Sequence, residues 1–424
     1  FTCCVADQNG GGFVSIIGSA STFSSCTVPT VSGHGGAIYL DLASGTETQY
    51  DLTGASYSTT TNTLNNAQYG KNLFIKAANL SAAVPINDDT RIKLGALNPE
   101  TDFYNLMGYH NGNSQIAIPL YYLYTAVDQN IYHVNIDNGQ TSGNIGGIDN
   151  NGCGHLSYPC LTIDYVITTI IGSSTPKLIG IINEYKLGSV ITIDQSGKEV
   201  KISNQLSDSG SYTDIKSIMN IEGTGKISLT AGTLSIDKII FCINQNGTSG
   251  YAITGTSTST QISINNCMMN MASDTSGYSI LTGLAELKGG ILNINNLTIK
   301  DIIISDSPII FINENAGSLI IDNCQFDSIL RTTSDDSTTK IGGTIEATIG
   351  ERSGIYTQIL SGGTLIIEGS CSFICCQARL DLGSALFASI SGTNSRLILE
   401  DGLQFEGYIK DLEGNIQTQF GQGR

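Results

Sequence analysis

Short runs of alternating apolar and polar residues fill the second half of this chain, and each run ends at an acidic or amide residue. Successive runs start 28, 30, 27, 46 and 32 residues apart, at Leu234, Ile262, Leu292, Leu319, Leu365 and Leu397. Strict alternation predicts a half-buried strand. Asn or Asp after a strand tolerates the left-handed backbone of a sharp corner. A strand and a corner that return at this period predict one turn of a parallel β-helix.

Two other motifs return along the chain and also indicate a repeat architecture. One is a glycine pair followed by a strand-like segment, at Gly11-Gly12, Gly35-Gly36, Gly342-Gly343 and, relaxed, Gly383-Ser384. The other is Phe-x-x-Cys, at Phe1–Cys4, Phe23–Cys26 and Phe373–Cys376, with Phe405 in the same place of a later unit. Self-similar units of this kind are typical of solenoids, which grow along one axis.

Composition agrees with many short strands. Charged residues make up 13% of the chain, Trp is absent, and Gly occurs 49 times. Long helices need charged helix formers, whereas β-branched residues broken by Gly and Asn favour strands and turns. We expect the polar segment 331–340 to be the insertion that lengthens the 46-residue step. We also expect Ile264 and Ile320 to point inward, so that aspartate at either position disrupts its coil.

A different pattern at 153–172 predicts where a solenoid begins. Cys153 and Cys160 bracket a Pro-containing loop and are the predicted disulfide. Thr162 is the predicted N-cap of a short helix. The apolar stripe of that helix would consist of Ile163, Val166, Ile167, Ile170 and Ile171. Such a helix would cover the open strand edge of the first coil.

These residues carry a resemblance to known families. The segment Pro159-Cys-Leu-Thr-Ile-Asp-Tyr-Val-Ile167 resembles the opening of pectin-lyase-like right-handed β-helix domains. The Gly-Gly-Ala-Ile and Phe-x-x-Cys repeats are similar to those of polymorphic outer-membrane-type surface proteins. Together they resemble very large secreted surface proteins of unicellular eukaryotes. The resemblance covers residues 1–70 and 150–424, and it implies a right-handed parallel β-helix rather than a particular activity.

The order of the motifs predicts an all-β chain that holds the end of one β-helix and most of a second. The predicted parts are terminal coils of a first β-helix (1–70), a β-rich cap (71–134), a Gly/Asn linker (135–152), an N-terminal cap loop with an amphipathic helix (153–172) and a second β-helix (173–424). Because coil motifs precede the start signal, we expect a slice of a longer chain or a processed unit. The alternative is a complete domain with one irregular end.

Within the predicted cap, two features refine the picture. Pro119 cannot donate to a sheet ladder, so it predicts an edge strand or a bulge. Tyr121, Tyr122 and Tyr124 form a cluster that we interpret as the apolar lid of the cap. A carbohydrate-stacking platform is the alternative. The Asp and Asn residues of 135–152 fit no EF-hand or nonapeptide calcium repeat, and we predict no metal or cofactor.

Cysteines and sequons indicate the compartment. The 11 cysteines include no pair with zinc-site spacing. Two arrangements stay open for Cys267, Cys324 and Cys371, each of which follows an alternating strand: a buried column of free thiols, or bridges between coils. The N-glycosylation candidates are Asn79, Asn246 and Asn296. We therefore predict an extracellular or cell-surface protein, and no apolar run here is long enough to span a bilayer.

Charge and side-chain chemistry narrow the function. The net charge of −17 excludes nucleic-acid binding, which needs a basic surface. The histidines are scattered, and the acidic pairs 88–89 and 335–336 lie in polar loops, so we predict no catalytic residues. The predicted function is structural and non-enzymatic: β-helix rods join end to end, within one long chain or between subunits, into a surface fibre or coat. An adhesin stalk that binds glycans is the first alternative. A polysaccharide lyase or hydrolase is the second, because the pectin-lyase-like fold hosts such enzymes.

Overall fold

The chain forms two compact units, residues 1–127 with 149–153 and residues 128–148 with 154–424. Of the 424 residues, the computed structural model describes those at the following positions: 17, 20–84, 105–109, 117–123, 127, 130–136, 146–149, 152–156, 158–170, 177–204, 216–244, 250–271, 280, 282–305, 309–312, 316–332, 345–347, 355–359, 364–374, 377–378, 387–390, 396–410 and 416–422. The motifs at Phe1–Cys4, Gly11-Gly12, Gly342-Gly343 and Gly383-Ser384 lie outside these residues.

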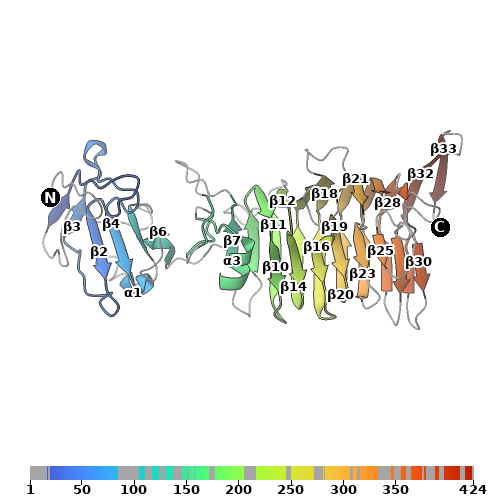
Figure 1. Cartoon of the computed structure of the whole chain (residues 1–424), viewed down its shortest axis with the longest axis horizontal. Coiled ribbons are helices and arrows are strands. Elements are labelled where there is room, and N and C mark those ends of the chain that lie inside the picture. Colours follow the sequence, from blue (N-terminus) through green and yellow to red (C-terminus); the bar gives the residue numbers. More distant parts are fainter. Residues whose placement is uncertain are drawn as a thin grey trace. The chain divides into compact units, whose positions relative to one another are not determined.

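Three long sheets build the larger unit (Figure 1). Sheet 1 contains β7 (Ile131–Val134), β8 (Lys177–Ile181), β11 (Glu199–Asn204), β14 (Gly232–Asp237), β17 (Thr260–Asn265), β20 (Gly290–Asn295), β23 (Ala316–Asp322), β27 (Thr364–Glu368) and β31 (Arg396–Leu399). Sheet 2 contains β9 (Glu184–Leu187), β12 (Ser217–Ile221), β15 (Ile239–Ile243), β18 (Met268–Met271), β21 (Thr298–Ser305), β24 (Gln325–Thr332), β28 (Ser372–Ile374), β32 (Gln404–Lys410) and β33 (Ile416–Gln422), with β29 (Gln377–Ala378) beside β24. Sheet 3 contains β10 (Val190–Ile193), β13 (Lys226–Leu229), β16 (Gly250–Gly255), β19 (Thr282–Leu287), β22 (Ile310–Ile312), β25 (Ile345–Ala347), β26 (Ile355–Ile359) and β30 (Phe387–Ile390).

The chain visits these sheets in rotation, which makes the larger unit an all-β parallel solenoid. After β11, β12 and β13 it returns to sheet 1 with β14, and β14 pairs parallel with β11. β15 pairs with β12 and β16 pairs with β13 in the same way. Each coil therefore hydrogen-bonds through its backbone to the coil before it, which satisfies the strand N–H and C=O groups.

The predicted starts of the alternating runs lie in register along sheet 1. Leu234 pairs with Ile262, Ile262 with Leu292, and Leu292 with Leu319. Leu319 pairs with Leu365, and Leu365 with Leu397. The differences in repeat length therefore arise in the segments that connect one strand of sheet 1 to the next. The predicted coil assignment is confirmed for these strands.

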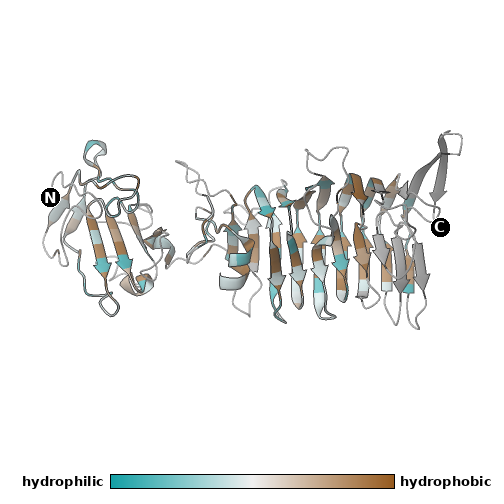
Figure 2. Cartoon of the chain, viewed as in Figure 1, coloured by the Kyte–Doolittle hydropathy of each residue, from teal (hydrophilic) through white to brown (hydrophobic). Residues whose placement is uncertain are grey.

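Inward side chains of sheet 1 stack into a continuous apolar column. At one inward position the column contains Ile236, Ile264, Ile294, Ile321 and Ile367, all at most 1% exposed. In Figure 2 the hydrophobic residues along the strands of the larger unit are coloured brown. The inward assignment of Ile320 is wrong: Leu319 and Ile321 are buried, whereas Ile320 is half-buried on the outer face, in register with Asn293 and Ile366.

A single left-handed residue makes the corner between sheets 1 and 2. The φ angles are 56° at Lys238, 51° at Asn266, 54° at Asn296 and 52° at Asn323. Successive corners are joined by side chains. Asn266 Nδ2 donates to Asp237 Oδ1 at 2.8 Å, and Asn296 Nδ2 donates to Asn266 Oδ1 at 2.8 Å. The left-handed residue was predicted to be the last of each run, whereas it is the residue after that, which is Asn at three of these four corners. Asn tolerates this backbone and its side chain can bond to the neighbouring corner.

The 46-residue step contains an extra strand. β25 and β26 follow each other in the chain and also lie next to each other in sheet 3, so no described strand of sheets 1 or 2 comes between them. Arg331 and Thr332, at the start of the predicted insertion, belong to β24. The rest of the predicted insertion, 333–340, lies outside the described residues.

A short helical segment covers the edge strand β10 of sheet 3. It consists of α3 (Ile163–Tyr165) and the π-helical η4 (Val166–Ile170), and α3 contacts β10. The Thr162 hydroxyl accepts from the N–H of Tyr165 at 3.1 Å, which confirms the predicted N-cap. Ile163, Val166 and Ile167 are buried, Ile170 is half-buried, and Ile171 is not described.

The widened turn of η4 has a local cause, and the segment is tied to the first coil by polar contacts. The Thr168 hydroxyl donates to the Asp164 carbonyl at 2.7 Å and so competes for the acceptor that an α-helical N–H would use. The Tyr185 hydroxyl accepts from the N–H of Ile163 at 3.2 Å. The buried Lys198 Nζ donates to the Ile167 carbonyl at 3.3 Å. Tyr185 and Lys198 thus bond to the start and the middle of the helical segment.

The outer edge of β7 in sheet 1 is also occupied. The N–H of His133 donates to the Gly154 carbonyl at 2.8 Å, and the N–H of Cys160 donates to the His133 carbonyl at 2.9 Å. The N–H of Asn135 donates to the Cys160 carbonyl at 2.9 Å. The segment 154–160 therefore closes the ladder at this edge.

At the opposite end the three sheets terminate differently. Sheet 2 ends in β33, which pairs antiparallel with β32. This strand was not foreseen, since the sequence after Phe405 shows no capping pattern. Among the described strands, β31 is the last of sheet 1 and β30 is the last of sheet 3.

The smaller unit holds two sheets. β1 (Ser21–Phe23) pairs parallel with β3 (Ala55–Tyr57). In the second sheet β2 (Ile38–Leu42), β4 (Leu73–Ala77) and β5 (Leu106–Tyr109) are parallel, and β6 (Ala117–Pro119) is antiparallel at the edge, as Pro119 predicts. The helical elements are η1 (Thr61–Thr63), α1 (Leu80–Ala83) and η2 (Leu120–Leu123). β2 lies before position 70, the predicted end of the first coils, and β4 lies after it. Their pairing therefore joins two parts of the chain that were predicted to be separate.

The recurrent motifs of the smaller unit have clear packing roles. Gly35 has a φ of 66°, and a Cβ on Gly36 would lie 2.5 Å from the Lys71 carbonyl oxygen, so each requires glycine. Phe23 is fully buried and stacks on Tyr57 with ring centroids 5.7 Å apart. Cys26 is buried three residues later. The glycine pair therefore makes a corner against the next coil, and Phe-x-x-Cys fills the core beneath it.

Candidate functional site

Two surfaces and one internal column carry the chemistry of the described residues. The first surface is the outer face of the sheet β2-β4-β5, which we call the aromatic face: His34, Tyr39, Tyr69, Phe74 and Tyr109. Phe74 is buried at its centre, and the three tyrosines and His34 are half-buried. Strand alternation places these rings on the side of the sheet opposite the core residues Ile38, Leu40, Leu73 and Ile75.

Rings of the aromatic face contact one another closely. Phe74 lies 5.8 Å from Tyr39, with an angle of 2° between the rings, and 4.9 Å from Tyr109. The Tyr109 hydroxyl and His34 Nε2 are hydrogen-bonded at 2.5 Å. The half-buried tyrosines leave parts of their rings and hydroxyl groups accessible around the buried Phe74, which suits a ligand with both apolar and hydroxylated sides.

The electrostatics of the aromatic face favour neutral rings. Burial lowers the pKa of His34, so its imidazole is neutral at pH 7. Burial, with a smaller effect of Asp41, raises the pKa of Tyr39. An ion pair joins Lys76 Nζ and Asp41 Oδ2 at 2.8 Å, at an exposed position of the neighbouring strands β2 and β4. The face is therefore uncharged, with one compensated charge pair beside it.

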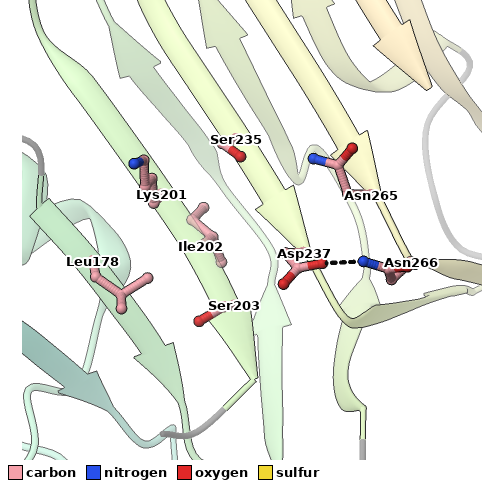
Figure 3. Close-up of a pocket in the computed structure, with 8 residues that line it drawn as sticks. All are labelled: Leu178, Lys201, Ile202, Ser203, Ser235, Asp237, Asn265 and Asn266. Atoms are coloured by element: carbon pink, nitrogen blue, oxygen red, sulfur yellow. Dashed lines mark hydrogen bonds between the residues drawn. The ribbon is translucent and has the colours of Figure 1, made fainter. Parts of the chain in front are cut away.

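A shallow groove on the outer face of sheet 1 is the second surface (Figure 3). Its volume is about 350 Å³, and it is lined by Leu178, Lys201, Ile202, Ser203, Ser235, Asp237, Asn265 and Asn266. Asp237 is the sole carboxylate in this lining, and it already accepts from Asn266. Lys201 Nζ lies 3.1 Å from Glu199 Oε1. The lining lacks a second carboxylate to work with Asp237 as an acid–base pair.

The internal column consists of the cysteines that follow the strands of sheet 1. Cys267, Cys324 and Cys371 are buried and free, as in the first of the two arrangements left open above. Each thiol donates to a carbonyl of its own corner, at 3.0 Å to Asn265 for Cys267 and at 3.2 Å to Asp322 for Cys324. Burial raises the pKa of Cys267 to about 12. These thiols pack as small apolar groups.

The predicted disulfide and glycosylation residues occupy different settings. Cys153 and Cys160 are both disulfide-bonded, and their pairing with each other stays a prediction. Asn79 is exposed and is the N-cap of α1, where its Oδ1 accepts from the N–H of Ala82 at 3.1 Å. Asn296 is exposed at a corner. Asn246 lies outside the described residues.

The remaining polar residues form no common site. His133 is buried with Nδ1 3.2 Å from the Gly154 carbonyl, and His155 forms a β-bridge with Tyr158. His110 and the acidic pairs 88–89 and 335–336 are not described. Tyr122 is buried and packs edge-on against Tyr121, Tyr124 is not described, and the lid stays a prediction.

In the described part of the structure, no group of three or more His, Cys, Asp or Glu side chains is placed to hold a metal ion. Within the same residues, no helix has the length and apolar character that crossing a membrane would require. Compared with known proteins, the sequence matches no family model and no curated protein.

Sequence reasoning missed the aromatic face. Tyr39 and Phe74 are 35 residues apart and were assigned to different predicted domains, so their register was not considered. The sequence nevertheless contained a usable signal. Tyr39 and Phe74 are each the second residue of a strand, and each of these strands follows a glycine corner. Aligning Gly35 with Gly70 would have placed the two rings side by side.

Proposed function

We propose that this chain is a non-enzymatic extracellular structural protein. In this proposal its larger unit is a right-handed parallel β-helix, and such rods join end to end, within one long chain or between subunits, into a surface fibre or coat. The parallel solenoid of three sheets supports the fold, and the resemblance of its repeats to those of large secreted surface proteins supports the setting. The two disulfide-bonded cysteines are suited to an oxidising compartment.

The observation that carries the proposal is the exposure of Leu399. This residue pairs with Ile367 and so continues the inward apolar column of sheet 1. Every earlier member of the column from Ile236 onward is at most 1% exposed, whereas Leu399 is 46% exposed. A further coil stacked on β31 would bury Leu399 and pair with the edge of β31 that faces away from β27, as each coil does for the one before it.

The two ends of the solenoid are not equivalent in this respect. The segment 154–160 pairs along β7, and α3 lies against β10, so two of the three sheets are covered at that end. At the other end β33 follows β32 in sheet 2, and among the described strands β31 and β30 are the last of sheets 1 and 3. We therefore place the join at the β31 end.

Electron microscopy of the native material tests the proposal. We expect fibres with a regular axial repeat, and we expect Leu399→Lys to abolish them because it puts a charge into the apolar column. The matched control is Ile398→Lys on the same strand, whose side chain is on the outer face in register with Ile366. This control should leave the fibres intact. Isolated rods from the wild-type protein, or fibres that persist with Leu399→Lys, would contradict end-to-end joining at β31.

A second candidate function is adhesion through glycans, and the aromatic face specifically favours it. Sugars present an apolar C–H face and a rim of hydroxyls. Half-buried Tyr39, Tyr69 and Tyr109 offer both ring faces and hydroxyls to such a ligand. Replacement of Tyr39 by alanine would remove a ring that stacks flat on Phe74.

Glycan-array binding tests this second candidate. If adhesion is a function of the chain, neutral glycans should bind and Tyr39→Ala should weaken binding about tenfold, the effect of losing roughly 1.4 kcal/mol of contact. Tyr251→Ala is the control, because Tyr251 is a half-buried tyrosine of sheet 3 that stacks on Phe311 in the larger unit. Equal binding by the wild-type protein and Tyr39→Ala would remove the aromatic face from consideration.

A further inference from the structure

Two of the three column cysteines are direct neighbours. Each column residue precedes the first strand residue of sheet 2 in its coil, and these first residues pair as Met268–Thr298, Thr298–Gln325 and Gln325–Ser372. The column therefore runs Cys267, Leu297, Cys324, Cys371. Leu297 separates Cys267 from Cys324, whereas no residue separates Cys324 from Cys371.

Hydrogen bonds aim the Cys371 sulfur at Cys324. The backbone N–H of Cys324 donates to Cys371 Sγ at 3.3 Å. The Cys371 thiol also lies 3.8 Å from the Ile321 carbonyl of the preceding coil and 3.2 Å from the Glu368 carbonyl of its own. Both cysteines are at most 1% exposed and free. The two sulfur atoms thus share one buried site between adjacent coils.

We propose that Cys324 and Cys371 are a cross-linking site that forms an inter-coil disulfide when a small-molecule disulfide such as glutathione disulfide oxidises the protein. Neighbouring parallel strands are about 4.8 Å apart. Cα separations of about 4.4–6.8 Å accommodate a disulfide. Cys267 is two coils from Cys324, or about twice the strand spacing, and is too far to pair.

The reaction balances through two thiol–disulfide exchanges. The backbone N–H of Cys324 donates to Cys371 Sγ and would stabilise a thiolate there, so we assign Cys371 as the attacking thiolate. It displaces one glutathione thiolate and forms a mixed disulfide with the other glutathione. The Cys324 thiolate then attacks the Cys371 sulfur and expels the second glutathione. Two protein thiols are oxidised, one glutathione disulfide is reduced to two thiols, and the protein's two protons pass to them.

The cross-link would close the irregular part of the solenoid. Cys324 and Cys371 are 47 positions apart, and the doubled strands β25 and β26 of sheet 3 lie between them. A disulfide across a chain segment of this length constrains the unfolded state strongly. The site therefore reinforces the step where the coil repeat is least regular.

Peptide mapping after oxidation tests the inference. The full chain is incubated with glutathione disulfide in urea below the unfolding midpoint, which opens the buried column transiently. After alkylation and trypsin digestion without reductant, we expect peptide 301–331, which contains Cys324, linked to peptide 353–379, which contains Cys371. Peptide 239–288, which contains Cys267, should not be linked to either. Absence of the 301–331 to 353–379 link would overturn the inference.

Matched variants identify the sulfur, because peptide 353–379 also contains Cys375 and Cys376. Cys371→Ser should abolish the link, and Cys267→Ser should keep it. A link that survives in Cys371→Ser would assign it to Cys375 or Cys376 and contradict the inference. The oxidised wild-type protein and Cys267→Ser should unfold about 5 °C or more above their reduced forms, whereas Cys371→Ser should show no such rise.

Discussion

Replacement of Ile264 by aspartate is expected to unfold the larger unit under conditions where the wild-type protein is folded. Ile264 is 0% exposed in the inward column of sheet 1, between Ile236 and Ile294. The carboxylate would lie among isoleucine side chains without a hydrogen-bond donor, and burying such a group is very costly. We expect a loss of about 4 kcal/mol or more in the free energy of unfolding, which is in the range of the most damaging core substitutions.

Ile320→Asp is the matched control, since it makes the same chemical change in the same sheet. The Ile320 side chain is half-buried on the outer face, where aspartate stays solvated. We expect a loss below about 1 kcal/mol. Urea unfolding followed by circular dichroism measures both variants. Similar losses for the two would contradict the assigned inward and outward faces of sheet 1.

The second large effect is expected for Asn266→Val at the corner between sheets 1 and 2. Asn266 has a φ of 51°, a region that valine strongly disfavours. Its side chain also donates to Asp237 and accepts from Asn296. Loss of two hydrogen bonds together with backbone strain should reduce the free energy of unfolding by about 3 kcal/mol.

Asn266→Gly separates the two contributions. Glycine adopts the left-handed backbone without strain but cannot replace the side-chain bonds. We expect a loss of about 1 kcal/mol for this variant in the same urea experiment. A glycine variant as unstable as the valine variant would show that the hydrogen-bonded ladder, rather than the backbone angle, dominates at this corner.

The coil assignment could be predicted from sequence because two independent signals coincide in the repeats that begin at Leu234, Ile262 and Leu292. Alternation identifies the strand, and Asn or Asp identifies the left-handed corner that ends it; both are local properties of a few residues. Leu234, Ile262 and Leu292 could therefore be aligned correctly although the spacing between them varies. The helix start at Thr162 was predictable for the same reason, since its capping bond spans three residues.

Two kinds of feature could not be predicted: which residues of an all-apolar run point inward, and which contacts form between residues far apart in the sequence. Leu319, Ile320 and Ile321 are all apolar, so the pattern does not say which of them points outward. β25 has three residues, too few for an alternation signal. The contacts of Tyr185 and Lys198 with the helical segment join residues 22 and 31 positions apart, and nothing local marks them.

The unequal ends of the solenoid have a consequence for biosynthesis. The residues that cover β7 and β10, and the coil they cover, leave the ribosome before the coils that end at β31. A solenoid stabilises each repeat mainly through its neighbours, so folding can propagate from any coil that is already stable. Chains emerge at about 5–20 residues per second, slowly enough for each coil to dock before the next is made. The covered end would thus act as the template on which later coils add in order, during translation.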